Sequence, residues 1–115
     1  MCSSDLLYDP RTGRIDPKVA EAWRKYDICH ILESNWATLG PKLEGKLHVL
    51  CGDVDTFFLE RAVHRLRDTL KTLGSDAQVE LIPGAGHMLP PSVYERIGRQ
   101  IAKHYERRYV KSPSK

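Results

Sequence analysis

The sequence predicts an α/β protein in which two parallel strands with flanking helices form an incomplete sheet. Residues 47–51 (LHVLC) are short and mostly apolar, as expected of a strand buried on both faces. An amphipathic helix is expected from residue 58 to residue 73, followed by a second strand at residues 77–82. Strands that alternate with helices are typical of βαβ units, whose two strands run parallel.

The N-terminal part is expected to contain short helical pieces. Asp16 followed by Pro17 indicates an N-cap with proline at the first helical position. Asp27 is expected to cap a second short helix. A further helical turn should end at Gly40 and Pro41, because both residues are poorly suited to a helix interior.

The C-terminal part predicts one more amphipathic helix, which should run to about residue 109. Its apolar residues recur at every fourth position: Val93, Ile97, Ile101 and Tyr105. Ser92 and Glu95 have the spacing of a capping box, so the helix is expected to begin at Ser92. Phe57 and Phe58 stand at the start of the helix predicted from residue 58, and they are expected to pack that helix onto the sheet.

Two strands are too few for a parallel sheet, because the apolar strand at residues 47–51 needs neighbours on both sides. We therefore expect residues 7–109 to be the C-terminal portion of a single domain and residues 110–115 to be a polar tail. Residues 1–6 back-translate to GTG TGC TCT TCC GAT CT, the end of a common sequencing adapter. They are expected to be a non-native scar of a reading frame truncated on its N-terminal side.

Composition excludes several classes of function. The net charge is +3, but basic and acidic residues are interleaved, which favours a solvated surface over nucleic-acid binding. No apolar run approaches the ~20 residues of a membrane span. The three cysteines form no C-x-x-C pair and the five histidines share no ligand spacing, so neither a disulfide framework nor a metal site is expected.

Two polar residues follow the two predicted strands. Asp55 comes just after the first strand, and His87 lies in a glycine-rich loop after the second. The carboxyl ends of parallel strands share one sheet edge, so the two side chains are expected to meet. A carboxylate beside an imidazole orients a general base. Asp53 is the rival acid, and helix capping is the alternative role of Asp55.

These loops resemble those of a known family. The segments Gly52-Asp53-Val54-Asp55 and Pro83-Gly84-Ala85-Gly86-His87, each after a strand, resemble the last third of an α/β-hydrolase. The upstream segments YDPRTG (8–13), NW (35–36), LGP (39–41) and GKLH (45–48) are similar to bacterial putative esterases related to enterochelin esterase and esterase D. The resemblance covers roughly residues 7–87.

The resemblance implies a serine hydrolase that acts on small-molecule carboxylic esters, with Asp55 as the catalytic acid and His87 as the catalytic base and with no metal or organic cofactor. The nucleophile motif G-x-S-x-G is absent from the sequence, so this chain is expected to be inactive alone. The alternatives are a hydrolase-fold peptidase or acyltransferase, or a non-catalytic α/β binding module. An exposed sheet edge would favour self-association.

Overall fold

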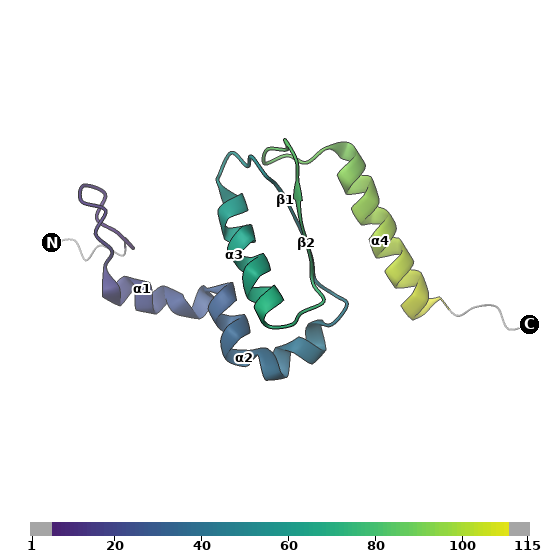
Figure 1. Cartoon of the computed structure of the whole chain (residues 1–115), viewed down its shortest axis with the longest axis horizontal. Helices are drawn as coiled ribbons and strands as arrows, with labels where there is room; N and C mark the ends of the chain where they lie inside the picture. Colours follow the sequence, from purple (N-terminus) through teal and green to yellow (C-terminus); the bar gives the residue numbers. More distant parts are fainter. Residues whose placement is uncertain (1–5, 111–115) are drawn as a thin grey trace, which may run out of the picture. The chain divides into compact units, whose positions relative to one another are not determined.

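The computed structural model describes residues 6–110, so the predicted tail beyond residue 110 and all but one residue of the predicted scar lie outside it. Its elements are shown in Figure 1. In chain order they are α1 (Pro17–Trp23), the 3₁₀-helix η1 (Arg24–Tyr26), α2 (Ile28–Leu43), β1 (His48–Gly52), α3 (Leu59–Thr72), β2 (Gln78–Ile82) and α4 (Pro91–Tyr109). The two strands pair in parallel, which confirms the predicted α/β class and strand direction.

The chain divides into two compact units. One contains α1, η1, α2 and the greater part of α3. The other contains nearly all of both strands, the first residues of α3, and α4. Both loops that follow the strands belong to this second unit, so the predicted site residues lie within one compact body.

In the first unit, α1 and α2 begin at the N-cap residues that the sequence predicts. Asp16 Oδ1 accepts hydrogen bonds from the N–H groups of Lys18 (2.9 Å) and Val19 (3.3 Å), and a proline occupies the first turn of α1. Asp27 Oδ1 accepts from the N–H of His30 at 3.3 Å at the start of α2. Both predicted caps are confirmed, since each carboxylate satisfies N–H groups that have no partner within the helix.

The prediction that Gly40 and Pro41 end the helix is wrong, because α2 continues to Leu43. Gly40 serves packing instead: a Cβ on it would lie 2.9 Å from Cε2 of the Trp36 indole. Helical hydrogen bonding also continues beyond Pro41, since the N–H of Glu44 donates to the Gly40 carbonyl at 3.1 Å.

The irregular position of α2 is Asn35, which has φ −127° and ψ 16°. Its Nδ2 donates to the carbonyl oxygen of Ile31 at 2.9 Å. A side chain that bonds the carbonyl one turn earlier competes with the backbone ladder and bends the helix. The interruption of α2 therefore comes from an asparagine rather than from the Gly-Pro pair.

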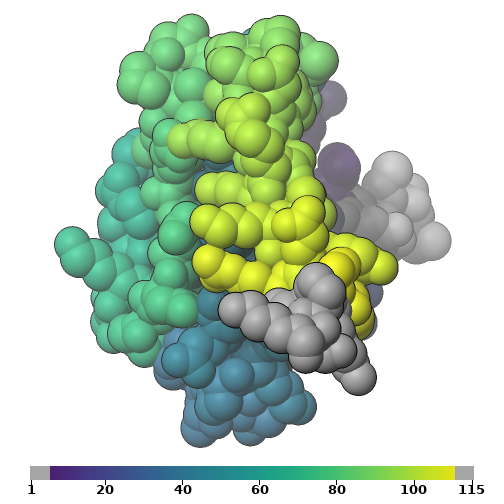
Figure 2. Space-filling view, turned by 90° about the vertical axis from the view of Figure 1, so that its right-hand side faces the viewer, coloured from purple at the N-terminus to yellow at the C-terminus, as the bar shows by residue number. Residues whose placement is uncertain are grey.

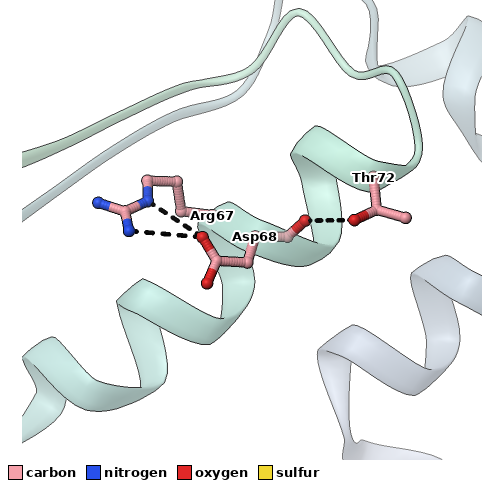
Figure 3. A network of polar contacts seen from close by, with 3 residues as sticks. All are labelled: Arg67, Asp68 and Thr72. Carbon is pink, nitrogen blue, oxygen red and sulfur yellow. Dashed lines mark hydrogen bonds and ion pairs between the residues drawn. The ribbon is translucent and has the colours of Figure 1, made fainter.

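Helix α3 ends as its sequence predicts. Gly74 has φ +71°, and the N–H of Ser75 reaches back to the carbonyl of Leu70 at 3.0 Å, as in a left-handed helix C-terminus. Figure 3 shows polar contacts near this end: the Arg67 guanidinium lies 3.4 Å from Asp68 Oδ1, and the Thr72 hydroxyl donates to the Asp68 carbonyl at 2.9 Å. The Arg67–Asp68 pair is solvent-exposed, so we expect it to add little stability.

The prediction that α4 begins with a capping box at Ser92 is wrong, because the helix begins one residue earlier. Pro90 is the N-cap and Pro91 the first helical residue, so Ser92 lies inside the first turn. Proline suits this place because its fixed φ is helical and its missing N–H would have no partner there. Two consecutive prolines therefore set the start of α4, one residue before Ser92.

The core of the second unit joins the sheet to the first half of α4. Its buried members are Ile82, Ala85 and Val93, and the partly buried Leu50, Leu89 and Ile97 pack against them. Farther along α4, Ile101 and Tyr105 continue the same four-residue spacing but are exposed. In Figure 2 this second half of α4 (yellow) lies open to the viewer.

The loops after the two strands lie backbone against backbone. The N–H groups of Asp53 and Val54 donate to the carbonyls of Ile82 and Ala85, each at 3.1 Å. The approach is so close that a Cβ on Gly52 would collide with the carbonyl oxygens of Ala85 and Gly86. Glycine at the end of β1 therefore allows the two loops to meet.

Within residues 6–110, no helix combines the length and the apolar content needed to cross a bilayer.

We predict that Gly52→Ala destabilises the protein by about 1–3 kcal/mol, the usual effect of inserting a methyl group into a packed site. The colliding atoms are backbone oxygens, which a side-chain rotation cannot move away. Urea unfolding measures the change. Gly98→Ala in α4 is the matched control, since its Cβ meets open space and should stabilise the helix by about 0.5–1 kcal/mol. Equal effects of the two substitutions would contradict the packing argument.

Candidate acid–base site

Asp55 is a buried carboxylate at the turn between β1 and α3, where it is 5% exposed. Its Oδ1 accepts the N–H of Phe57 at 2.7 Å, and its carbonyl accepts the N–H of Phe58 at 3.0 Å. A side chain that bonds the backbone two residues onward closes a tight turn. The turn includes Phe58 at φ +59°, directly before α3 begins at Leu59.

His87 comes from the loop after β2 and reaches the same carboxylate. Its Nδ1 lies 3.1 Å from Asp55 Oδ2, although the two residues are 32 positions apart in the sequence. The Asp55 side chain is 3% exposed and the His87 side chain 48%. The structure therefore brings the two predicted site residues together, with the carboxylate covered and the imidazole open to solvent.

The surroundings of Asp55 favour its charged form. Burial by itself raises the pKa of this carboxyl, but hydrogen bonds from the Phe57 N–H, from His87 and from the Leu59 N–H, together with the charge of His87, outweigh that effect. The pKa of Asp55 consequently lies below its ordinary value. At neutral pH this group is a carboxylate and can only accept hydrogen bonds.

An accepting carboxylate determines the tautomer of the neutral imidazole. Because Asp55 Oδ2 accepts, Nδ1 of His87 must carry the hydrogen, and the lone pair of the ring is then on Nε2. His87 is about half exposed, which leaves the ring accessible. An imidazole held in this state is suited to take a proton from an incoming hydroxyl group or water.

Asp53, the rival acid, has a different partner. Its Oδ1 accepts the N–H of Gly84 at 2.7 Å, and Gly84 has φ +70° in the turn that follows β2. Asp53 therefore joins the two loops, while it is Asp55 that accepts the hydrogen bond from His87. One carboxylate oxygen of Asp55 closes the turn before α3 by accepting the N–H of Phe57, and the other meets the imidazole.

Phe57 lies beside the imidazole. Its ring centroid is 4.7 Å from that of His87 and the ring planes meet at 78°, an edge-to-face arrangement. The expectation that Phe57 and Phe58 pack α3 onto the sheet is wrong, because they are 66% and 64% exposed. The placement of Phe57 in a turn could have been predicted from the Asp-x-Phe spacing, since an Asx turn from Asp55 fixes the backbone of Phe57.

Cys51, in β1, is a further residue with a nucleophilic side chain in this part of the fold. The Cys51 thiol is buried, and burial, followed by the charges of Asp55 and Glu60, raises its pKa, which disfavours the reactive thiolate. In the described part of the chain, no hydrogen bond joins His87 to a serine, and no group of three or more His, Cys, Asp or Glu side chains is arranged to hold a metal ion.

We predict that acid weakens the fold through Asp55. Because the pKa of this carboxyl is lower in the folded than in the unfolded chain, its stabilisation is complete above the ordinary aspartate pKa and is lost as pH falls through the lower, folded value. Urea midpoints measured from pH 6 down to pH 2.5 should fall, and Asp55→Asn should flatten part of that fall. Asp53→Asn, which keeps an accepting oxygen, should retain it. An unchanged pH profile in Asp55→Asn would count against the assignment.

We predict that neutral His87 carries its hydrogen on Nδ1. Nitrogen-15 shifts of the imidazole at pH 9 should show a protonated Nδ1 and an unprotonated Nε2, because Asp55 Oδ2 only accepts. His64, on the exposed surface of α3, is the internal reference in the same spectrum. A protonated Nε2 on His87 would mean that the 3.1 Å contact does not persist in solution.

Comparison with known proteins assigns no family to this chain. No protein-family model, no curated protein and no solved structure matches the chain. What the site can do follows from three groups: a buried carboxylate at Asp55, an open imidazole at His87, and the aromatic ring of Phe57 beside it.

Proposed function

We propose that Asp55 and His87 are the acid and the base of a Ser-Asp-His triad in a hydrolase of carboxylic esters, and that this chain is the C-terminal portion of an α/β-hydrolase. The observation that carries the proposal is the 3.1 Å contact between Asp55 Oδ2 and His87 Nδ1. The contact lies beyond the C-terminal ends of two parallel strands, where α/β sheets bind their ligands.

In the proposed mechanism, Nε2 of His87 removes the proton of a serine hydroxyl as its oxygen attacks the ester carbonyl. The resulting imidazolium is stabilised by the Asp55 carboxylate and then gives its proton to the leaving alcohol. Nε2 next removes a proton from water as the water oxygen attacks the acyl group. The imidazolium then returns this proton to the serine oxygen as the acyl–serine bond breaks and the carboxylic acid leaves. Asp55 stays ionised throughout, as its lowered pKa favours.

The nucleophile is expected from polypeptide beyond this chain. The sequence holds no G-x-S-x-G motif, and the nearby Cys51 thiol is held in its protonated form. The resemblance of residues 8–48 to bacterial esterases favours ester hydrolysis over the peptidase and acyltransferase reactions that use the same triad.

We predict that the 115-residue chain alone does not turn over p-nitrophenyl acetate above the buffer rate, because no acyl-enzyme can form without the nucleophile. Steady-state absorbance measures the rate. Robust hydrolysis that His87→Ala abolishes would refute the missing-nucleophile part of the proposal.

The positive test extends the chain. Reading the gene upstream of the codon for Leu7 should reveal a G-x-S-x-G segment after a predicted strand, and the longer protein should hydrolyse the same ester. In that protein His87→Ala should lower kcat by about 10³-fold or more. Asp53→Asn, which keeps the acceptor for the Gly84 N–H, should leave kcat nearly unchanged. An active longer protein indifferent to His87→Ala would contradict the proposal.

A further inference from the structure

The two loops that carry Asp55 and His87 also expose large apolar side chains. Val54 and Phe57 flank the buried acid, Met88 follows the base, and all three are exposed. Single exposed apolar residues are common on protein surfaces, but an exposed aromatic ring in contact with an open imidazole marks a candidate ligand surface. Phe57 is the member whose position relative to His87 is fixed by contact.

One carboxylate holds both the base and this aromatic ring. Asp55 Oδ1 accepts the backbone N–H of Phe57 at 2.7 Å, and Asp55 Oδ2 lies 3.1 Å from Nδ1 of His87. The edge-to-face contact of the two rings, at 4.7 Å, closes the arrangement. The ring of Phe57 is thus set at a defined place beside the proton-accepting group, although most of its surface is open.

The neighbouring phenylalanine is engaged differently. The guanidinium of Arg61 lies over the Phe58 ring, 5.6 Å from its centroid, as in a cation–π contact. Phe57 and Phe58 are almost equally exposed, but it is Phe57 that contacts the imidazole. A group that binds against the exposed imidazole of His87 therefore has the Phe57 ring within reach.

We propose that Phe57 forms a subsite for an uncharged aromatic group of the substrate, so that the substrate class is esters that carry an aryl group next to the carbonyl. This inference rests on the proposed function. Aromatic rings recognise each other through edge-to-face or offset stacking in addition to burial, so an aryl group gains more from this surface than an alkyl group of similar size. Phe57 acts here in specificity, and His87 keeps the proton transfer.

The test uses the full chain and ligands that cannot be hydrolysed. Acetophenone places an aryl group next to a carbonyl and has no leaving group, and cyclohexyl methyl ketone is its saturated counterpart. Titration followed by NMR of the His87 and Phe57 rings should show saturable shifts with acetophenone. The saturated ketone should bind about three- to tenfold more weakly, the range expected from one aromatic pair.

Two variants localise the effect. Phe57→Leu should weaken acetophenone binding by about three- to tenfold and bring its affinity close to that of the saturated ketone. Phe58→Leu is the matched control, because it removes an equally exposed ring that faces Arg61, and should change the affinity less than about twofold. Nuclear Overhauser contacts between acetophenone and the Phe57 ring in the unmodified chain give the same answer without any substitution.

Equal affinity for the two ketones, equal effects of the two leucine variants, or the lack of saturable shifts would overturn the aryl subsite. None of these outcomes touches the acid–base assignment, which is judged by the tautomer of His87 and by ester turnover of the longer protein. A failed subsite with a protonated Nδ1 leaves the proposed function standing. A retained aryl preference in a longer protein that ignores His87→Ala would instead refute the proposed function.

Discussion

The carboxylate of Asp55 is the group on which this site depends. One of its oxygens closes the turn that leads into α3, and the other meets the imidazole of His87. Both contacts favour the ionised form in a position where burial alone would oppose it. The same group therefore sets the local backbone, the tautomer of the neutral imidazole and the position of the neighbouring Phe57 ring.

The two-stranded sheet brings the Asp55 carboxylate and the His87 imidazole together. The parallel pairing of β1 and β2 brings both following loops to one edge, and Gly52 allows their backbones to approach. Asp53 then joins the two loops through the N–H of Gly84, which leaves Asp55 to face inward. Two aspartates separated by a single residue thus have separate roles: Asp53 joins the loops and Asp55 orients the histidine.

Features that depend on neighbouring residues in the sequence could be predicted. The strands lie within one residue of their expected limits, and the caps at Asp16 and Asp27 form as their residue types indicate. The meeting of Asp55 and His87 could also be predicted, because it follows from strand order and from the parallel direction of a βαβ unit.

Features that are set by contacts between helical turns or between loops could not be predicted from the sequence. Gly40 has the sequence signature of a helix end, but the indole of Trp36 occupies the space that a side chain would need. Pro91 rather than Ser92 opens α4, because consecutive prolines outweigh a capping spacing. Phe57 is exposed and contacts His87 from the loop after β2, and periodicity along α3 does not reveal a contact between loops.

The most direct test of the central interaction is a double-mutant cycle on Asp55 and His87. Urea unfolding of the unmodified chain, of Asp55→Asn, of His87→Gln and of the double variant gives the coupling between the two side chains. If they hold each other as the 3.1 Å contact indicates, the double variant is clearly less destabilised than the sum of the single ones. Strictly additive losses would show that the carboxylate and the imidazole do not interact in solution.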